Sequence, residues 1–174
     1  VSYTVSDGYV EVPTSVIFTV SGKNDAPVVS GTVQAGSISE NAPALDIGLL
    51  ANAADIDHLD VVHVKTGQGA AVTADVTSGT WTAPVAFNVV NDHLVIDPAQ
   101  FNSLRAGEAV DITFTYQVTD GNKQNVDPTA TAHVTIVGQN DAPLSIGLST
   151  THAIDQSTAG TVVAKLSAVD PDHA

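Results

Sequence analysis

Apolar and polar residues alternate along two segments of the chain, and this pattern predicts long strands. In residues 110–119 every even-numbered position is apolar and every odd-numbered position is polar. Residues 130–136 repeat the alternation, with one face formed by Ala130, Ala132, Val134 and Ile136. Successive side chains of a β-strand point to opposite faces, so each segment presents one apolar face to a core.

Shorter runs rich in Val and Thr predict further strands, at residues 61–65, 71–77, 80–87 and 93–96. Turn-forming dipeptides separate the strands, namely Ser78-Gly79, Asn91-Asp92 and Asp120-Gly121. No segment has a long helical period, and one helical turn is expected at residues 98–104, with Pro98 at its start and Asp97 as its cap. Many short strands of this kind predict an all-β fold, an antiparallel β-sandwich with Greek-key connections.

One motif occurs twice along the chain. The sequence YTVSDG at residues 3–8 matches YQVTDG at residues 116–121, and the tetrapeptide Asn-Asp-Ala-Pro follows each copy, at 24–27 and at 140–143. The offset between the copies is 113 residues at the tyrosine and 116 at the asparagine, which is the length of a whole domain. The prediction is therefore a tandem repeat with three parts: the last two strands of one repeat at 1–27, a complete repeat at 28–143, and the beginning of a third at 144–174.

The chain begins with Val1 in what reads as the middle of a strand, so we expect it to be a piece of a longer protein. Strands that lack their sheet partners invite pairing with other chains. We therefore expect weak, concentration-dependent self-association through the two end pieces.

The repeated motif resembles that of the cadherin-like repeats of large bacterial adhesins, the VCBS-type or RTX-adhesin repeats. The matching residues are YQVTDG followed by GQNDAP, each present in a second similar copy, and the pattern Phe101-x-x-Leu104-x-x-Gly107-Glu108 before Phe114-x-Tyr116. The resemblance covers essentially the whole chain. It implies cadherin- or immunoglobulin-like sandwiches in a row, with Ca²⁺ bound where one repeat meets the next.

The resemblance also implies which residues hold the metal. For the first junction these are Asn24, Asp25, Asp55, Asp57 and Asp120. For the second they are Glu40, Glu108, Asn140, Asp141, Asp170 and Asp172. By analogy, Asp7 would belong to a junction before this chain. The third part has Asp155 or Gln156 where the central repeat has Glu40, which predicts weaker binding at its far end.

Composition agrees with a site for a hard cation. The net charge is −14, and sixteen of the nineteen acidic residues are Asp, a residue that favours turns. Ca²⁺ takes six to eight oxygen ligands, and carboxylates gathered without a metal repel one another. The alternative is that these residues are solvated loop acids. Asp120-Gly121 also suits a plain hairpin turn, and for Glu108 a solvated surface position is the preferred interpretation.

A different calcium motif is rejected. The stretch from Asp55 to Asp60 is similar to the start of an EF-hand loop. An EF-hand needs Gly at its sixth position and Glu at its twelfth, where this chain has Asp60 and Thr66.

Other chemistry is not expected. The chain has no Cys, so it forms no disulfide or thiol site, and its six His lack the spacing of a zinc site. No nucleophile or phosphate-loop motif is present, so we expect no enzyme. Five basic residues against nineteen acidic ones disfavour nucleic acid and anionic membranes, and no apolar run is long enough for membrane insertion. Trp81 is expected to be core or half-buried rather than a platform for a sugar.

The predicted function is that of a calcium-rigidified extender in a secreted adhesin of a bacterial cell surface or biofilm, whose partners are the adjacent repeats of the same chain. Two alternatives stay open. One is a Ca²⁺-dependent module that binds extracellular polysaccharide or a host surface, with exposed aromatics such as Tyr9 taking part. The other is an accessory domain of a secreted enzyme.

Overall fold

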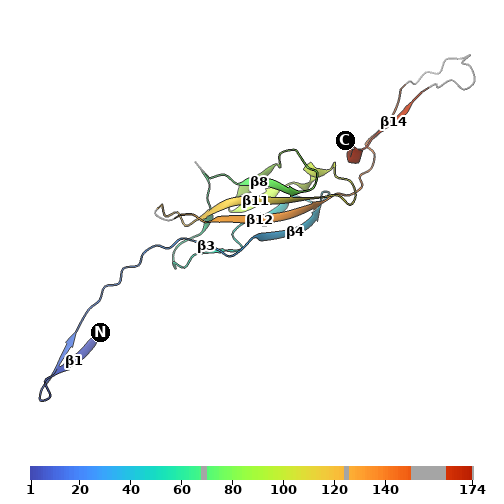
Figure 1. The fold of residues 1–174 in the computed structure, drawn as a ribbon. Coiled ribbons are helices and arrows are strands. Elements are labelled where there is room, and N and C mark those ends of the chain that lie inside the picture. The colour runs from blue at the N-terminus through green and yellow to red at the C-terminus, as the bar shows by residue number, and fades with distance from the viewer. Residues whose placement is uncertain (68–69, 124–125, 150–163, 174) are drawn as a thin grey trace, which may run out of the picture.

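The computed structural model describes residues 1–67, 70–123, 126–149 and 164–173, and its regular structure is nearly all β (Figure 1). A hairpin of β1 (Ser2–Ser6) and β2 (Glu11–Ser15) lies at one end of the molecule, and a pair formed by β13 (Ser145–Leu148) and β14 (Leu166–Val169) lies at the other. The sandwich lies between them. Its hydrophobic core is formed by buried residues from Val33 to Ile136.

The larger sheet is built around β11 (Ala109–Thr119), which pairs with β12 (Thr129–Val137) on one side. On its other side lie β7 (His63–Val64) and β8 (Thr73–Ser78). All these pairs are antiparallel, as expected. The last strand, β4 (Val33–Ser39), runs parallel to β12, and this pair is the exception to the expected antiparallel arrangement among the described strands. Parallel neighbours need a long connection, which is here the whole of the intervening chain.

The smaller sheet has β10 (His93–Ile96) at its centre, between β5 (Leu45–Gly48) and β9 (Phe87–Val90). A short pair of β3 (Val28–Val29) and β6 (Ala53–Ala54) follows the first linker. The five-stranded and the three-stranded sheet share one apolar core, and the rings of Phe87 and Phe114 meet across it at 5.2 Å between centroids. The Greek-key connectivity and the division into repeats stay predictions.

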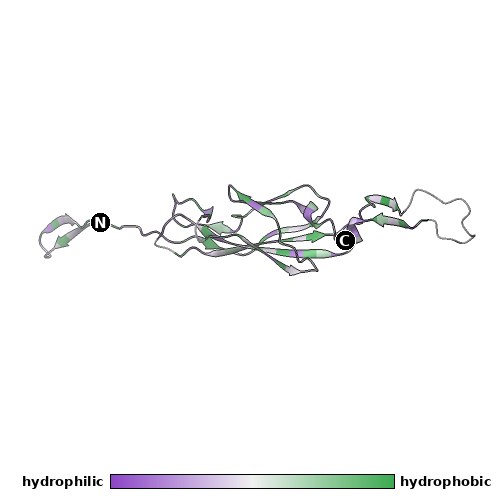
Figure 2. Ribbon diagram, turned by 90° about the horizontal axis from the view of Figure 1, so that it is seen from above, coloured by the Kyte–Doolittle hydropathy of each residue, from purple (hydrophilic) through white to green (hydrophobic). Residues whose placement is uncertain are grey.

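The alternating pattern of β11 is confirmed, because its five even-numbered side chains are at most 1% exposed. On β12 the alternation is also confirmed, with Ala130, Ala132, Val134 and Ile136 all buried. Figure 2 shows apolar and polar residues alternating along the strands of the central part. Trp81 is half-buried, as expected, with its ring 4.7 Å from that of Phe101.

Several strand and turn predictions need adjusting. The strand expected at 80–87 is wrong, since β9 begins only at Phe87 and residues 79–86 are irregular. Gly79 leaves the strand with a φ of 96°, and Pro84 has no N–H for a ladder. The Asn91-Asp92 turn is confirmed, with both residues at positive φ. The predicted helical turn is confirmed as a 3-10 helix over Pro98–Phe101, capped by the Asp97 carboxylate. A second 3-10 helix spans Pro171–His173.

Apolar side chains of the two end pieces are exposed. In the N-terminal part Ile17, Phe18 and Val20 are at least 70% exposed, and in the C-terminal part Leu144 and Ile146 are at least 72% exposed. No partner chain is described, so the expected self-association stays a prediction.

Tyr116 joins the two sheets through a buried hydrogen bond, since its hydroxyl donates to the backbone oxygen of Leu49 at 2.5 Å. Burial raises the pKa of Tyr116 to about 12. Between pH 10 and 12 the unfolded chain loses this proton while the folded chain keeps it, so stability falls as pH rises, by about 2–3 kcal/mol in all. The variant Tyr116→Phe is expected to be about 1–2 kcal/mol less stable at pH 7, because the Leu49 oxygen loses its donor. Urea unfolding at pH 7, 10 and 11.5 measures both effects, and an unchanged alkaline slope in the variant would contradict the assignment.

Candidate metal centre

The carboxylates of Asp55, Asp57 and Asp60 gather in the loop that follows β6. One oxygen from each lies within 4.8 Å of the others, and these residues could hold a metal ion. No other group of three potential ligands this tight occurs in the described part of the chain. The loop folds on itself because Asp57 N donates to Asp55 Oδ1 at 2.8 Å and Asp60 N donates to the Asp57 carbonyl at 3.1 Å.

The carboxylates of this loop oppose one another's ionisation. Burial raises the pKa of Asp60, and the nearby charges of Asp57, Asp55 and Asp120 raise it further. The Oδ2 atom of Asp55 is buried and has no hydrogen-bond partner in the described structure. Like charges held this close favour either a proton or a cation between them.

The first Asn-Asp-Ala-Pro linker lies directly against this loop. Asp25 N donates to Asp57 Oδ2 at 2.7 Å, and Asn24 Nδ2 donates to Asp120 Oδ2 at 2.7 Å. The structure therefore brings together all five residues that the sequence proposed for the first junction, from three separate segments. Asp120 also accepts from Asn122 N at 2.7 Å, so its role in the hairpin turn exists beside any role at the junction.

The second linker repeats the local geometry of the first. Asp141 N donates to Asp172 Oδ2 at 3.0 Å, as Asp25 N does to Asp57. Asp172 N donates to Asp170 Oδ1 at 3.1 Å, as Asp57 N does to Asp55. In each linker the asparagine Nδ2 also donates to the carbonyl of the next residue, at 2.6 Å in the first and 2.9 Å in the second. Two segments far apart in sequence thus adopt the same arrangement of acidic groups.

Glu40 adds a buried carboxylate to the second junction. It follows β4, has no exposed surface, and accepts from Gln139 N through Oε1 at 2.5 Å. Burial raises the pKa of Glu40, and the charges of Asp141 and Asp172 raise it further, against the hydrogen bond from Gln139. The parallel pairing of β4 with β12 accounts for this position, because both strands end beside the second linker.

Three carboxylate oxygens at the second junction are buried without a hydrogen-bond partner in the described structure, namely Glu40 Oε2, Asp141 Oδ2 and Asp172 Oδ1. These three carboxylates are spaced more widely than those of Asp55, Asp57 and Asp60, whose ligand oxygens all lie within 4.8 Å of one another. A buried carboxylate oxygen without a donor is costly. Oxygen ligands alone, most of them charged, are what a hard divalent cation such as Ca²⁺ prefers, so these residues fit such an ion.

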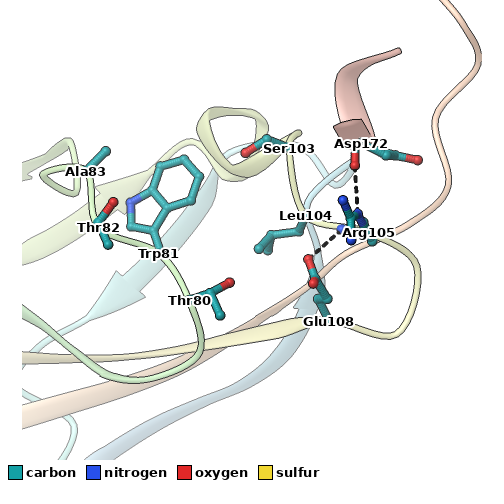
Figure 3. Close-up of a pocket in the computed structure, with 9 residues that line it drawn as sticks. All are labelled: Thr80, Trp81, Thr82, Ala83, Ser103, Leu104, Arg105, Glu108 and Asp172. Carbon is teal, nitrogen blue, oxygen red and sulfur yellow. Dashed lines mark hydrogen bonds between the residues drawn. The ribbon is translucent and has the colours of Figure 1, made fainter. Parts of the chain in front are cut away.

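Glu108 lies at the edge of the second junction, as Figure 3 shows. Its Oε2 accepts from the backbone N of Arg105 at 2.9 Å, which closes a turn. Its inclusion in the ligand set stays a prediction. Asp7 has a comparable turn role, because its Oδ1 accepts from Tyr9 N and Val10 N, and the bond from Val10 foremost lowers the pKa of Asp7. Asp155 and Gln156 lie outside the described residues.

Sequence reasoning missed two groups at the junctions. The sequence pattern gives Asp60 no role beyond its mismatch with the sixth position of an EF-hand loop, yet its carboxylate lies with those of Asp55 and Asp57. The signal was three Asp within six residues. Asn41 was also missed, and its Nδ2 donates to Asp141 Oδ1 at 3.3 Å. An asparagine directly after Glu40 gave no separate signal.

Both helices of the described chain are single short 3-10 turns, and none is long and apolar enough to cross a membrane. No protein-family model matches the chain, and no curated protein matches its sequence.

Proposed function

We propose that the chain is a spacer whose consecutive modules are stiffened by Ca²⁺ at the two Asn-Asp-Ala-Pro linkers. One observation carries the proposal: the Glu40 carboxylate is fully buried, has one oxygen without a partner, and faces the charges of Asp141 and Asp172. The ligands would be Asn24, Asp25, Asp55, Asp57, Asp60 and Asp120 at the first linker. At the second they would be Glu40, Asn140, Asp141, Asp170 and Asp172, with Glu108 as a further candidate.

The cation would act by relieving repulsion between carboxylates of different segments. Without it, each ionised carboxylate opposes the ionisation of its neighbours. A divalent ion that binds only the closed junction stabilises it by about 2.7 kcal/mol at 100 times its dissociation constant. Calcium sites of extracellular modules bind with dissociation constants of about 10⁻⁴ to 10⁻³ M. Calcium at 5 mM, about 5 to 50 times these constants, would contribute about 1–2 kcal/mol per site and so shift the hinge toward one fixed geometry.

The wider setting of this spacer is part of the proposal. The parts of the molecule follow one another in an extended line (Figure 1), as a spacer requires. Together with the resemblance of the motif to bacterial adhesin repeats, this favours a secreted protein of the cell surface or biofilm. The neighbours of the central sandwich would be further modules of the same chain.

Calcium titration of the intact chain tests the proposal. We expect heat on titration, a higher melting temperature, and a narrower distribution of interatomic distances in solution scattering when EDTA is replaced by 5 mM Ca²⁺, about five times the weaker dissociation constants of this class. Mg²⁺ at the same concentration should do less, since it needs a smaller and stricter octahedral site. If Ca²⁺ changes neither heat, stability nor shape, the chain is not a calcium-stiffened spacer.

A second candidate is a module that binds polysaccharide in a Ca²⁺-dependent way. The favouring observation is the exposure of Tyr9, which is 97% exposed at the tip of the β1–β2 hairpin. Exposed aromatic rings offer flat apolar faces with a polar tip. Retention on a glycan array that needs both Ca²⁺ and Tyr9 would favour this function, and a spacer would show no retention.

A further inference from the structure

The turn at residues 105–108 is fixed to the end of β12, next to the second linker. Glu108 N donates to the Arg105 carbonyl at 2.9 Å, and Gly138 N donates to the Glu108 carbonyl at 2.9 Å. The Glu108 side chain closes the same turn through its bond from Arg105 N. Leu104, directly before the turn, is only 3% exposed and belongs to the core. The turn is therefore hydrogen-bonded to the sandwich and packed against its core.

Gly138 allows this turn to lie unusually close to the linker. A Cβ atom at this position would lie 2.3 Å from the Arg105 carbonyl oxygen and 2.7 Å from the Leu104 Cβ, so no larger residue fits without displacement of backbone. The backbone that precedes Asn140 and the backbone that carries Arg105 are thus in direct contact. Arg105 therefore projects from a turn that lies directly against the residue two positions before Asn140.

The Arg105 side chain reaches from this turn to the segment that follows the second linker. Its Nε donates to the backbone carbonyl of Asp172 at 3.0 Å, a contact drawn in Figure 3. Arg105 is the one arginine in the sequence, and a guanidinium offers directional donors that an ammonium lacks. Its acceptor is the carbonyl, so Arg105 occupies neither carboxylate oxygen of Asp172. Oδ2 accepts from Asp141 N, and Oδ1 has no hydrogen-bond partner in the described structure and could bind a cation.

We propose that Arg105 is a positioning residue that holds the loop of Asp170 and Asp172 against the central sandwich before any cation binds. This inference rests on the proposed function for its consequence, since the loop would carry two of the calcium ligands. A cation that meets ligands already in place loses less free energy to ordering them. The hinge angle at the second linker is thus set by a contact between protein groups as well as by the metal.

The charge of Arg105 and its positioning of the loop have opposite effects on the calcium affinity of the second junction, so the sign of the change in affinity tests its role. A guanidinium near carboxylates repels Ca²⁺, so removal of its charge alone would raise the calcium affinity of the second junction. Loss of positioning lowers the affinity. For Arg105→Gln we expect a fall of about threefold, because the ordering of the loop then costs binding free energy. A rise in affinity would overturn the proposal.

The decisive measurement is made without calcium. The chain lacks cysteine, so spin labels at Thr73→Cys on β8 and Ser145→Cys on β13 report the distance between the two parts by pulsed electron paramagnetic resonance. In EDTA, Arg105→Gln is expected to reduce the population of the docked distance by about fivefold, as one charge-assisted hydrogen bond is lost. Lys65→Gln removes a basic residue whose partner is Asp127, away from the second linker, and serves as the matched control.

An EDTA distance distribution of Arg105→Gln identical to that of the unsubstituted chain would overturn the positioning role. Near-ultraviolet circular dichroism of Trp81 checks that the sandwich stays folded in both variants. Absence of calcium binding in the unsubstituted chain would instead remove the proposed function, while the EDTA comparison would still decide what Arg105 does. The two failures are therefore distinguishable.

Discussion

Replacing Glu40 with glutamine is expected to weaken calcium binding at the second junction by roughly ten- to hundredfold, since ligand charge strongly tunes the affinity of such sites. The variant keeps the shape of the side chain and its carbonyl acceptor for Gln139 N. It removes the charge that faces Asp141 and Asp172. In EDTA the variant should be at least as stable as the unsubstituted chain, because a buried and repelled carboxylate is gone. Isothermal titration and thermal unfolding measure the two effects.

Two further variants separate the junctions. Glu11→Gln makes the same chemical change on the exposed strand β2 and should leave calcium binding intact. Asp57→Asn should weaken the first junction and spare the second, because the Asp57 carboxylate accepts from Asp25 N in the first linker and belongs to the cluster with Asp55 and Asp60. Equal calcium binding by Glu40→Gln and Glu11→Gln would exclude Glu40 from the ligand set.

Replacing Phe114 with alanine is expected to cost about 3–5 kcal/mol of unfolding free energy, the largest stability effect of any single change considered. Phe114 has no exposed surface, lies on the central strand of the larger sheet and packs edge-on against Phe87. Its removal leaves a cavity between the two sheets that neighbouring strands cannot close. Urea unfolding followed by the fluorescence of Trp81, the single tryptophan, measures the loss.

The neighbouring residue supplies the control for this prediction. Thr115 lies on the same strand with its side chain on the opposite, polar face, where it is partly exposed. Thr115→Ala should change stability by about 0.5 kcal/mol or less. A loss below about 1 kcal/mol for Phe114→Ala would mean that this face of β11 is not the core.

The candidate site was predictable only in part. Asn24, Asp25 and Asp120 belong to the motif that occurs twice, whereas Asp55 and Asp57 are implied by the resemblance of that motif to a repeat family. The convergence of Asp60 with them was not predicted, because the sequence does not tell which way a loop carboxylate points. The strand predicted at 80–87 from its Val and Thr content is wrong because Gly79 ends β8 at positive φ and Pro84 lacks an N–H for the ladder.

The sequence by itself determined the parts of the fold that depend on local periodicity. The two-residue period of residues 110–119 and 130–136 dictates which side chains are buried, because a strand has only two faces. The turn residues Asn91 and Asp92 and the cap Asp97 were equally local. Each depends on groups within a few positions of one another, so the chain carries the information in consecutive residues.

Only the tertiary structure decided what depends on long-range contact. The burial of Glu40 follows from the parallel pairing of β4 with β12, which brings it to Gln139 from 99 positions away. The contact of Arg105 with Asp172 likewise spans 67 positions. Sequence periodicity fixes the face on which a side chain lies, but strand order and register fix its neighbours. The charge that surrounds a carboxylate, and so its preference for a cation, is therefore a property of the folded chain.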